Sequence, residues 1–237
     1  MQSGNLDSFI VAGRPKPQSI ATSQEIRDRG SLFAATIYAA SSAEQAAGCI
    51  THLSKVVHGQ KPASHEMNAW RCMVLKAGRS GLGGPDDFEV RESSADDGER
   101  WAGEKILTIM RKQGVIDAVV VVSRWYGGTM LGPARFSHIE TCTLEVCREF
   151  KRQEEVKEAL ATLRNLDDIL AQLRDDLAAS KGQAAPDSGP AKSKTPDYSG
   201  WIDWDIPKAR RLIRAREGSI NSVKELLKTS ASGDVTQ

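Results

Sequence analysis

The sequence predicts an α/β fold of the α+β type, a two-layer sandwich with two helices on one face of a four-stranded mixed sheet. Two apolar runs rich in β-branched residues, 31–39 and 117–125, predict strands, and amphipathic helical patterns occur near residues 41–58 and 98–113. A long helical pattern begins at Pro133 and predicts a C-terminal helical or coiled-coil extension. With 40% hydrophobic residues among 237, the chain can bury a core of this size.

The first element that we expect is a strand over residues 31–39. Almost every residue in it is apolar, β-branched or aromatic, which is typical of a strand buried on both faces. A helix follows, because Ser41 or Ser42 can cap its first turn and apolar residues then recur at helical spacing. Gly59 and Pro62 end this helix.

A hairpin, a helix and a central strand come next. Residues 68–76 and 88–91 are expected to pair across the loop GRSGLGG, which lacks the Gly-Lys-Ser/Thr ending of a phosphate-binding loop. The acidic segment DDGE at 96–99 introduces a helix that ends at Gly114. Residues 117–125 contain a run of valines, which indicates a central strand covered on both faces.

The long helix is expected to continue from Pro133 to Gly182, because neither proline nor glycine interrupts it. Its distal part carries apolar residues separated by 4, 3, 3, 4, 3 and 4 residues, a mean of 3.5, which is the coiled-coil period. Two partners for this seam are open, a second copy of the chain or the C-terminal tail docking on it. The seam residues are Val156, Leu160, Leu163, Leu166, Leu170, Leu173 and Leu177.

These patterns divide the chain into five regions. Residues 1–27 are expected to form a flexible arm, 28–150 the α/β domain and 151–180 the coiled-coil extension. Residues 181–197 are rich in Gly, Pro, Ser and Lys, which predicts a disordered linker, and 198–237 form an amphipathic helical tail.

Composition narrows the classes of protein to consider. A net charge of +1 excludes a strongly cationic DNA-coating protein, although the positive excess lies in residues 181–237. The four cysteines include no C-x-x-C, so neither a zinc knuckle nor a disulfide framework is indicated, and we expect no metal or cofactor. No signal peptide and no apolar run near ~20 residues is present. We therefore expect a soluble cytoplasmic protein without a membrane partner.

The end of the valine strand offers the strongest candidate site. A glycine elbow and the start of a helix can place backbone N–H groups around an anion, with Arg135 and His138 one helical turn apart as further donors. The alternative is a tight turn with Trp125 and Tyr126 packed in the core. The elbow residues are Arg124, Trp125, Tyr126, Gly127 and Gly128.

The acidic segment is a second candidate. Asp96, Asp97 and Glu99 offer oxygens for Mg²⁺ or Ca²⁺, or an acid and base pair, but a helix cap is the favoured interpretation. His65, just before the second strand, is close enough in the expected sheet to meet Asp97 or Arg124. A histidine satisfied by its own loop is the alternative.

The tail carries a cationic run just after two tryptophans, Trp201 and Trp204. Arginine and aromatic groups of this kind bind RNA or ribosomes, whereas the favoured alternative is the solvated face of a helix that docks on the leucine seam. The run comprises Lys208, Arg210, Arg211, Arg214 and Arg216.

Several motifs resemble the Impact family in order and spacing, most of all its eukaryotic, fungal-type branch. The motifs are DRGS-x-F at 28–33, SH and NAWR within 64–71, DDGE with AG within 96–103, VVVSRWYGG at 120–128 and LGP-x-x-F-x-HI at 131–139. The resemblance implies a two-helix, four-stranded fold like that of a small-subunit ribosomal protein. The family's eukaryotic regulators carry an N-terminal RWD domain, which this chain is expected to lack.

The resemblance also implies a function. Family members inhibit the starvation-responsive kinase of translation initiation factor two by competing for the ribosome-associated scaffold that activates it, and they associate with actin and ribosomes. No enzymatic activity is established for the family, and nucleic-acid binding has been proposed for bacterial relatives. Carried onto this chain, the binding surface would comprise His65, Asp96, Asp97, Glu99, Arg124, Trp125, Tyr126, Gly127 and Gly128.

We therefore expect a non-enzymatic regulator of translation under stress that acts by binding proteins. One alternative is an RNA-binding or ribosome-binding protein that uses Arg124, Arg135 and the basic tail. A further alternative is a hydrolase-like enzyme that uses His65 with Asp97.

Overall fold

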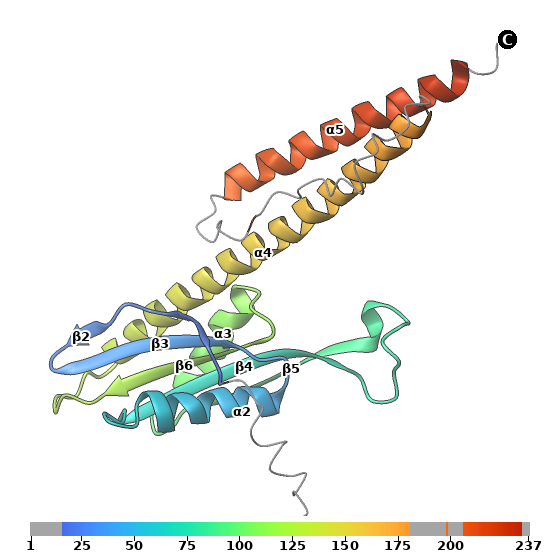
Figure 1. Cartoon of the computed structure of the whole chain (residues 1–237). Coiled ribbons are helices and arrows are strands. Elements are labelled where there is room, and N and C mark those ends of the chain that lie inside the picture. The colour runs from blue at the N-terminus through green and yellow to red at the C-terminus, as the bar shows by residue number, and fades with distance from the viewer. Residues whose placement is uncertain (1–15, 181–197, 199–205, 234–237) are drawn as a thin grey trace, which may run out of the picture. The chain divides into compact units, whose positions relative to one another are not determined.

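The computed structural model describes residues 16–180, 198 and 206–233 (Figure 1). The chain divides into two compact units, Met1–Lys151 and Arg152–Gln237. The expected linker at 181–197 and the residues Trp201 and Trp204 lie outside the described residues. Within the described ranges, no helix combines the length and the apolar character needed to cross a bilayer.

One antiparallel sheet of six strands forms the centre of the first unit. Its order is β1-β3-β6-β4-β5, and β2 also pairs with β3. The expectation of a four-stranded mixed sheet is wrong, because two further strands are present and the pairings are antiparallel. The strands are β1 (Ser19–Thr22), β2 (Ile26–Asp28), β3 (Ser31–Ala39), β4 (His65–Leu75), β5 (Phe88–Ala95) and β6 (Ala118–Trp125).

Strands β1 and β2 come from residues that we expected to form a flexible arm. Both pair with β3, and Ile20 and Ile26 pack against the main core. Strands this short have too little alternation to be recognised from sequence. Pairing with a long, well-buried neighbour stabilises them, so this expectation is corrected for residues 19–22 and 26–27.

The helices cover both faces of the sheet, as Figure 1 shows. Helices α3 and α4 pack against Phe33, Met67 and Val120 on one face. Helix α2 packs against Tyr38 and Val121 on the other, so the fold has three layers instead of two. The helices are α2 (Ala43–His52), which continues into a π-helical segment (Leu53–Val57), α3 (Ala102–Lys112), α4 (Ala134–Ser180) and α5 (Ile206–Gly233), with a short 3-10 turn at Pro85–Asp87.

Strands β3 and β6 lie beside each other at the centre, as the sequence predicts. The valines of β6 from Val119 to Val122 are fully buried. Because their side chains alternate between the two faces, each face receives two of them, and both need a helical cover. Ser42 caps α2 by accepting a hydrogen bond from the Gln45 N–H at 3.2 Å.

The four cysteines are free and buried, and their chemistry yields a prediction. Burial raises the pKa of the Cys72 thiol to about 11 and that of Cys147 to about 12. Only the thiolate reacts with iodoacetamide. We therefore expect no labelling of the folded protein at pH 8 and full labelling of the protein unfolded in urea. Mass spectrometry measures the labelling. Rapid labelling of the folded protein would contradict this burial.

The same shifts set the sign of an alkaline effect. Above pH 9 the thiols of the unfolded chain lose protons while the folded chain retains them. Folding therefore binds protons in this window, and the free energy of unfolding should fall as the pH rises from 9 towards 11. Urea titrations at these pH values measure the trend.

The second unit is a helical pair. Val156 and Leu163 of α4 share one buried cluster with Ala209 of α5 and with Tyr198. Arg216 of α5 forms an ion pair with Asp167 of α4. The tail helix therefore docks on the proximal part of the leucine seam, one of the two arrangements left open by the sequence.

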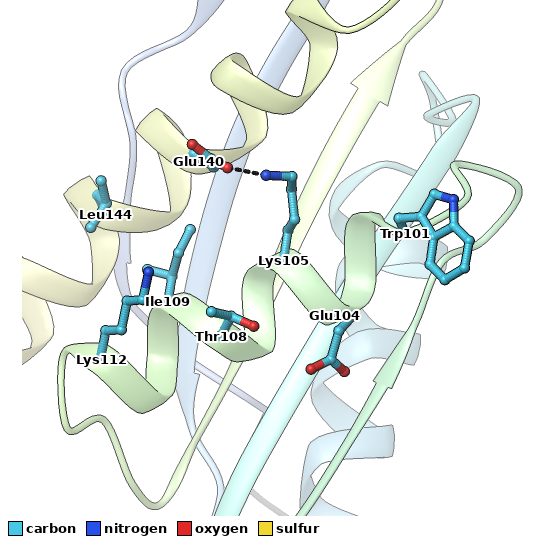
Figure 2. Close-up of a pocket in the computed structure, with 8 residues that line it drawn as sticks. All are labelled: Trp101, Glu104, Lys105, Thr108, Ile109, Lys112, Glu140 and Leu144. Carbon is cyan, nitrogen blue, oxygen red and sulfur yellow. Dashed lines mark hydrogen bonds and ion pairs between the residues drawn. The ribbon is translucent and has the colours of Figure 1, made fainter.

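Helix α3 begins beside an unusual tryptophan. Trp101 adopts a left-handed backbone (φ 73°) and its side chain is 59% exposed, next to the Arg100 guanidinium at 4.7 Å. It stands at the end of a cavity of about 430 Å³ between α3 and the first turns of α4, which Figure 2 shows. An ion pair of Lys105 with Glu140 spans the two helices there.

Candidate functional site

The glycine elbow after β6 is built by a close approach of two backbone segments. A Cβ on Gly127 would lie 1.9 Å from the carbonyl carbon of Gly30, so only glycine fits there. Gly30 itself has φ +80°, and the Gly127 N–H donates to Ser31 Oγ at 3.2 Å. Gly128 has φ +85° and open space around it, so its conformation rather than its contacts favours glycine. The elbow therefore joins the end of β6 to the turn between β2 and β3.

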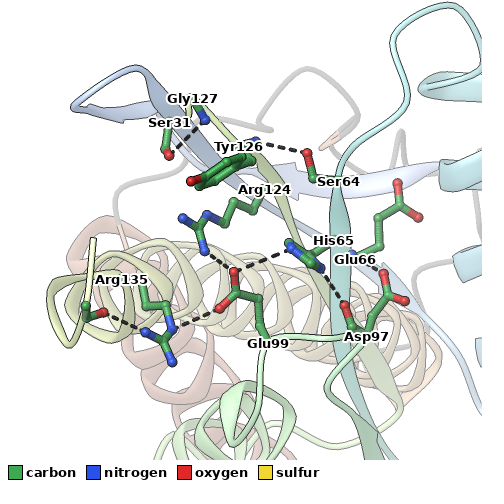
Figure 3. Close-up of polar contacts among 11 residues, drawn as sticks. Ser31, Ser64, His65, Glu66, Asp97, Glu99, Arg124, Tyr126, Gly127 and Arg135 are labelled. Atoms are coloured by element: carbon green, nitrogen blue, oxygen red, sulfur yellow. Dashed lines mark hydrogen bonds and ion pairs between the residues drawn. The ribbon is translucent and has the colours of Figure 1, made fainter. Parts of the chain in front are cut away.

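The centre of the site is a buried ion cluster at the end of the sheet (Figure 3). Glu99 forms ion pairs with Arg124 and with Arg135, whose Nε lies 2.9 Å from Glu99 Oε2. The side chains of Glu99 and Arg124 are 7% and 6% exposed. The Arg124 guanidinium also lies over the ring of Phe33, 5.3 Å from its centroid, and over that of Tyr126, 5.4 Å from its centroid. The single carboxylate of Glu99 thus neutralises only part of the positive charge of the two arginines.

His65 lies at the edge of this cluster. Its Nδ1 contacts the main-chain oxygen of Asp97 at 2.7 Å, and its Nε2 lies 3.7 Å from Glu99 Oε1. The Asp97 carboxylate instead accepts the N–H of Glu66 at 2.6 Å. The side-chain pair of His65 with Asp97 expected for a hydrolase is therefore not formed. The His65 side chain contacts a main-chain oxygen, and the Asp97 side chain accepts from a main-chain N–H.

Asp96 has the capping role that the sequence favoured. Its carboxylate accepts the N–H groups of Trp101 and Gly103, each at 2.9 Å, at the start of α3. These bonds hold the left-handed turn at Trp101. Glu99 does not complete a capping box but points into the ion cluster.

His138 lies apart from the cluster. Its Nε2 is 2.8 Å from Asp28 Oδ2, and its ring lies 5.3 Å from the ring of Phe33. Hydrogen bonds from Arg29 and then from His138 lower the pKa of Asp28. This contact ties α4 to the end of β2, and the role of His138 as a donor at the elbow stays a prediction.

The two aromatic residues of the elbow differ in burial. The Trp125 indole donates to the Lys61 main-chain oxygen at 3.0 Å and packs edge-on against His58. The Tyr126 side chain is 45% exposed, while its N–H donates to Ser64 Oγ at 3.0 Å. Trp125 is therefore structural, and Tyr126 is available to a partner.

A cavity of about 340 Å³ opens above the ion cluster. Met130 is 79% exposed and, with Tyr126, supplies apolar surface at the site. Arg135 Nη1 donates to the Gly132 main-chain oxygen at 2.8 Å, which fixes the arginine that faces the cavity. The cavity is lined by His65, Gly98, Glu99, Arg124, Tyr126, Met130, Leu131, Gly132 and Arg135.

Sequence reasoning missed two kinds of contributor. Met130 and Leu131 line the cavity but carry no functional group that a motif search would select. Ser31 and Ser64 accept the backbone N–H groups of the elbow. The Ser-His pair at 64–65 was a usable signal, because a polar residue before a strand often satisfies a neighbouring turn.

A comparison with models of protein families identifies the domain that carries this site. The model of the Impact N-terminal domain matches residues 29–147, half of the chain. The chain belongs to the Impact family. The matched segment begins at the β2–β3 turn and ends in α4, so the residues of the ion cluster lie inside this Impact domain.

Individual Impact relatives match over the same region. An Impact family member of Saccharomyces cerevisiae is 42% identical over 60 residues, 25% of this chain and 35% of the relative. The protein Impact homolog of the same yeast is 37% identical over 123 residues, 52% of this chain and 43% of the relative. The solved two-domain translational regulator Yih1 is 33% identical with a TM-score of 0.35, covering 56% and 46% of the two chains. The match spans less than half the length of these relatives.

Proposed function

We propose that this chain is a non-enzymatic regulator of translation that acts by binding other proteins. Membership of the Impact family supports this proposal, since the family resemblance implies control of translation under starvation. The finer proposal is that the chain binds the ribosome-associated scaffold of the starvation-responsive kinase.

The observation that carries the proposal is the chemistry of the cavity. Glu99 is engaged by two arginines and His65 Nδ1 by a main-chain oxygen, so these groups hold one another in place. A rigid charged floor with the exposed side chains of Tyr126 and Met130 beside it suits recognition of a protein side chain.

A capture experiment with the full chain tests this proposal. The tagged chain is incubated with lysates of fed and starved cells, and the bound scaffold and ribosomal proteins are quantified by mass spectrometry. We expect Met130→Glu to reduce scaffold capture about ten-fold, because it places a charge in an apolar contact. Val56→Glu is the matched control, since Val56 is 63% exposed and lies on the α2 side of the sheet.

Two results would count against the proposal. Failure of the wild-type chain to retain the scaffold in either lysate would remove the proposed partner. Equal capture by the wild type and Met130→Glu would show that the cavity is not part of the binding surface.

We propose RNA binding as a second candidate function, now restricted to the tail. Arg124 and Arg135 are committed to Glu99, which argues against their use on RNA. Arg210, Arg211 and Arg214 of α5 are exposed. Binding to a ribosomal RNA fragment that falls with salt, and that is lost when these three residues are changed to Glu, would favour this function.

A further inference from the structure

Strand β5 forms one edge of the sheet, since its partner in the described sheet is β4 alone. Figure 1 shows the far end of the β4–β5 hairpin extending beyond the rest of the sheet. A sheet edge presents backbone N–H and C=O groups to a further strand, and proteins normally protect such an edge. The chemistry of this edge therefore indicates what it binds.

An apolar patch lies on one face of this hairpin. Met73 is directly opposite Val90 in the register, and Leu75 is directly opposite Phe88. Directly opposite residues share a face, and so do residues two apart on a strand. The four side chains therefore form one patch, and they are exposed by 40%, 38%, 43% and 38% respectively.

The backbone hydrogen bonds define which groups point outward. The Lys76 N–H donates to the Asp87 main-chain oxygen at 2.8 Å, so residues 76 and 87 form a hydrogen-bonded pair. Such pairs alternate along an antiparallel ladder. The N–H and C=O groups of Phe88, Val90 and Glu92 therefore point away from β4, towards the open edge.

An independent contact agrees with this alternation. The N–H of Met73 donates to Asp117 Oδ1 at 2.8 Å. Asp117 immediately precedes β6, which lies on the opposite side of β4 from β5. Met73 thus uses its backbone donor away from β5, as expected for the partner of Val90 in a non-hydrogen-bonded pair.

We propose that β5 pairs antiparallel with β5 of a second copy of this chain, about a two-fold axis through Val90. The backbone groups of Val90 then bond to their own equivalents, and those of Phe88 bond to Glu92 of the second copy. Glu89 lies opposite Arg91 of the second copy, and the symmetry makes this ion pair twice. Such non-hydrogen-bonded positions bring opposing side chains closest together.

The charges select this register over its neighbours. A shift of the axis by one residue towards Glu89 places Glu89 opposite its own copy, and a shift towards Arg91 places Arg91 opposite its own copy. Like charges directly opposite are destabilising in a sheet. The edge is therefore complementary to itself, and the apolar patch continues across the axis from Val90 to Val90. This self-complementarity argues for a second copy over an unrelated strand.

Charge reversal gives a sharp test with the full chain, by sedimentation velocity over a concentration series. We expect the wild type to dimerise, and Glu89→Arg and Arg91→Glu each to weaken dimerisation about ten-fold or more. An equimolar mixture of the two variants should dimerise again, because each then meets opposite charges. Glu25→Arg is the matched control, since Glu25 and Arg27 form a similarly exposed pair on another part of the chain.

The outcomes separate the proposal from other modes of association. Restoration of the dimer in the mixture, with neither variant dimeric alone, requires contact between residues 89 and 91 of different copies. A wild type that stays monomeric throughout the series would overturn the proposal. Dimerisation of either single variant at wild-type strength would also overturn it, because another surface would then be responsible.

Discussion

Gly127→Ala should destabilise the α/β unit by about 3 kcal/mol or more, the upper end of what overpacking costs. The added Cβ would lie 1.9 Å from the carbonyl carbon and 2.2 Å from the carbonyl oxygen of Gly30. These are backbone atoms at a turn that also has a positive φ, so neither segment can yield without losing its own contacts. The effect on this unit is measured by urea unfolding, with hydrogen exchange of the β3 and β6 amides as the readout.

Two glycines in the same unit serve as controls. Gly128→Ala meets open space, so only its φ of +85° opposes the change, with a cost of about 1 kcal/mol. Gly48 lies inside α2, where an added Cβ would meet nothing within 4 Å, and alanine there should stabilise the helix by about 1 kcal/mol. A Gly127→Ala variant as stable as Gly128→Ala would contradict the close approach of the two turns.

Glu99→Ala should cost about 3 to 5 kcal/mol, the range for breaking a buried ion pair. The change leaves the Arg124 guanidinium buried without its carboxylate, and its Nε has no hydrogen-bond acceptor among the described residues. Arg135 is 25% exposed at its side chain and can turn towards water, so Arg135→Ala should cost less. Urea unfolding of the wild type, Glu99→Ala and Arg135→Ala under the same conditions ranks their free energies of unfolding.

A double replacement distinguishes charge burial from packing. Glu99→Leu combined with Arg124→Met removes both charges and keeps apolar volume, and such replacements of buried pairs are often neutral. We expect the double variant to recover most of the stability lost in Glu99→Ala. If it is as unstable as the single variant, the loss arises from the shape of the site instead of from an unpaired charge.

The central elements of the fold could be predicted from sequence because their signals are local. The valine run of β6 and the apolar run of β3 each need burial on both faces, and Ser42 caps the next helix in the way its position suggests. Strands β1 and β2 carry no such pattern in their few residues, and it is pairing with β3 that stabilises them. Helix α2 lies on the other face of the sheet from α3 and α4, and tertiary packing likewise decides this placement.

The sequence named many of the residues around this cavity, but it did not predict which of them contact one another. Asp96 was correctly favoured as a cap, because capping depends on the next few residues. The partners of Glu99 come from β6 and α4, and those of His138 come from β2 and β3, so long-range contacts decide them. The contact between Gly30 and Gly127 was also invisible, since a close approach of backbones needs both segments in place.

The central place of β6 has a consequence for synthesis of the protein. β3 and β4 are made earlier than β6, yet each pairs with β6 along most of its length. A nascent chain that has not yet released residues 118–125 therefore displays two unpaired apolar edges, which are prone to association. Pairing Ala39 with Ala118 closes a long loop, and the entropy lost in closing it slows this step of folding. The sheet is thus completed only after residues 118–125 have left the ribosome, and chaperones that shield nascent strands should raise the yield of folded protein.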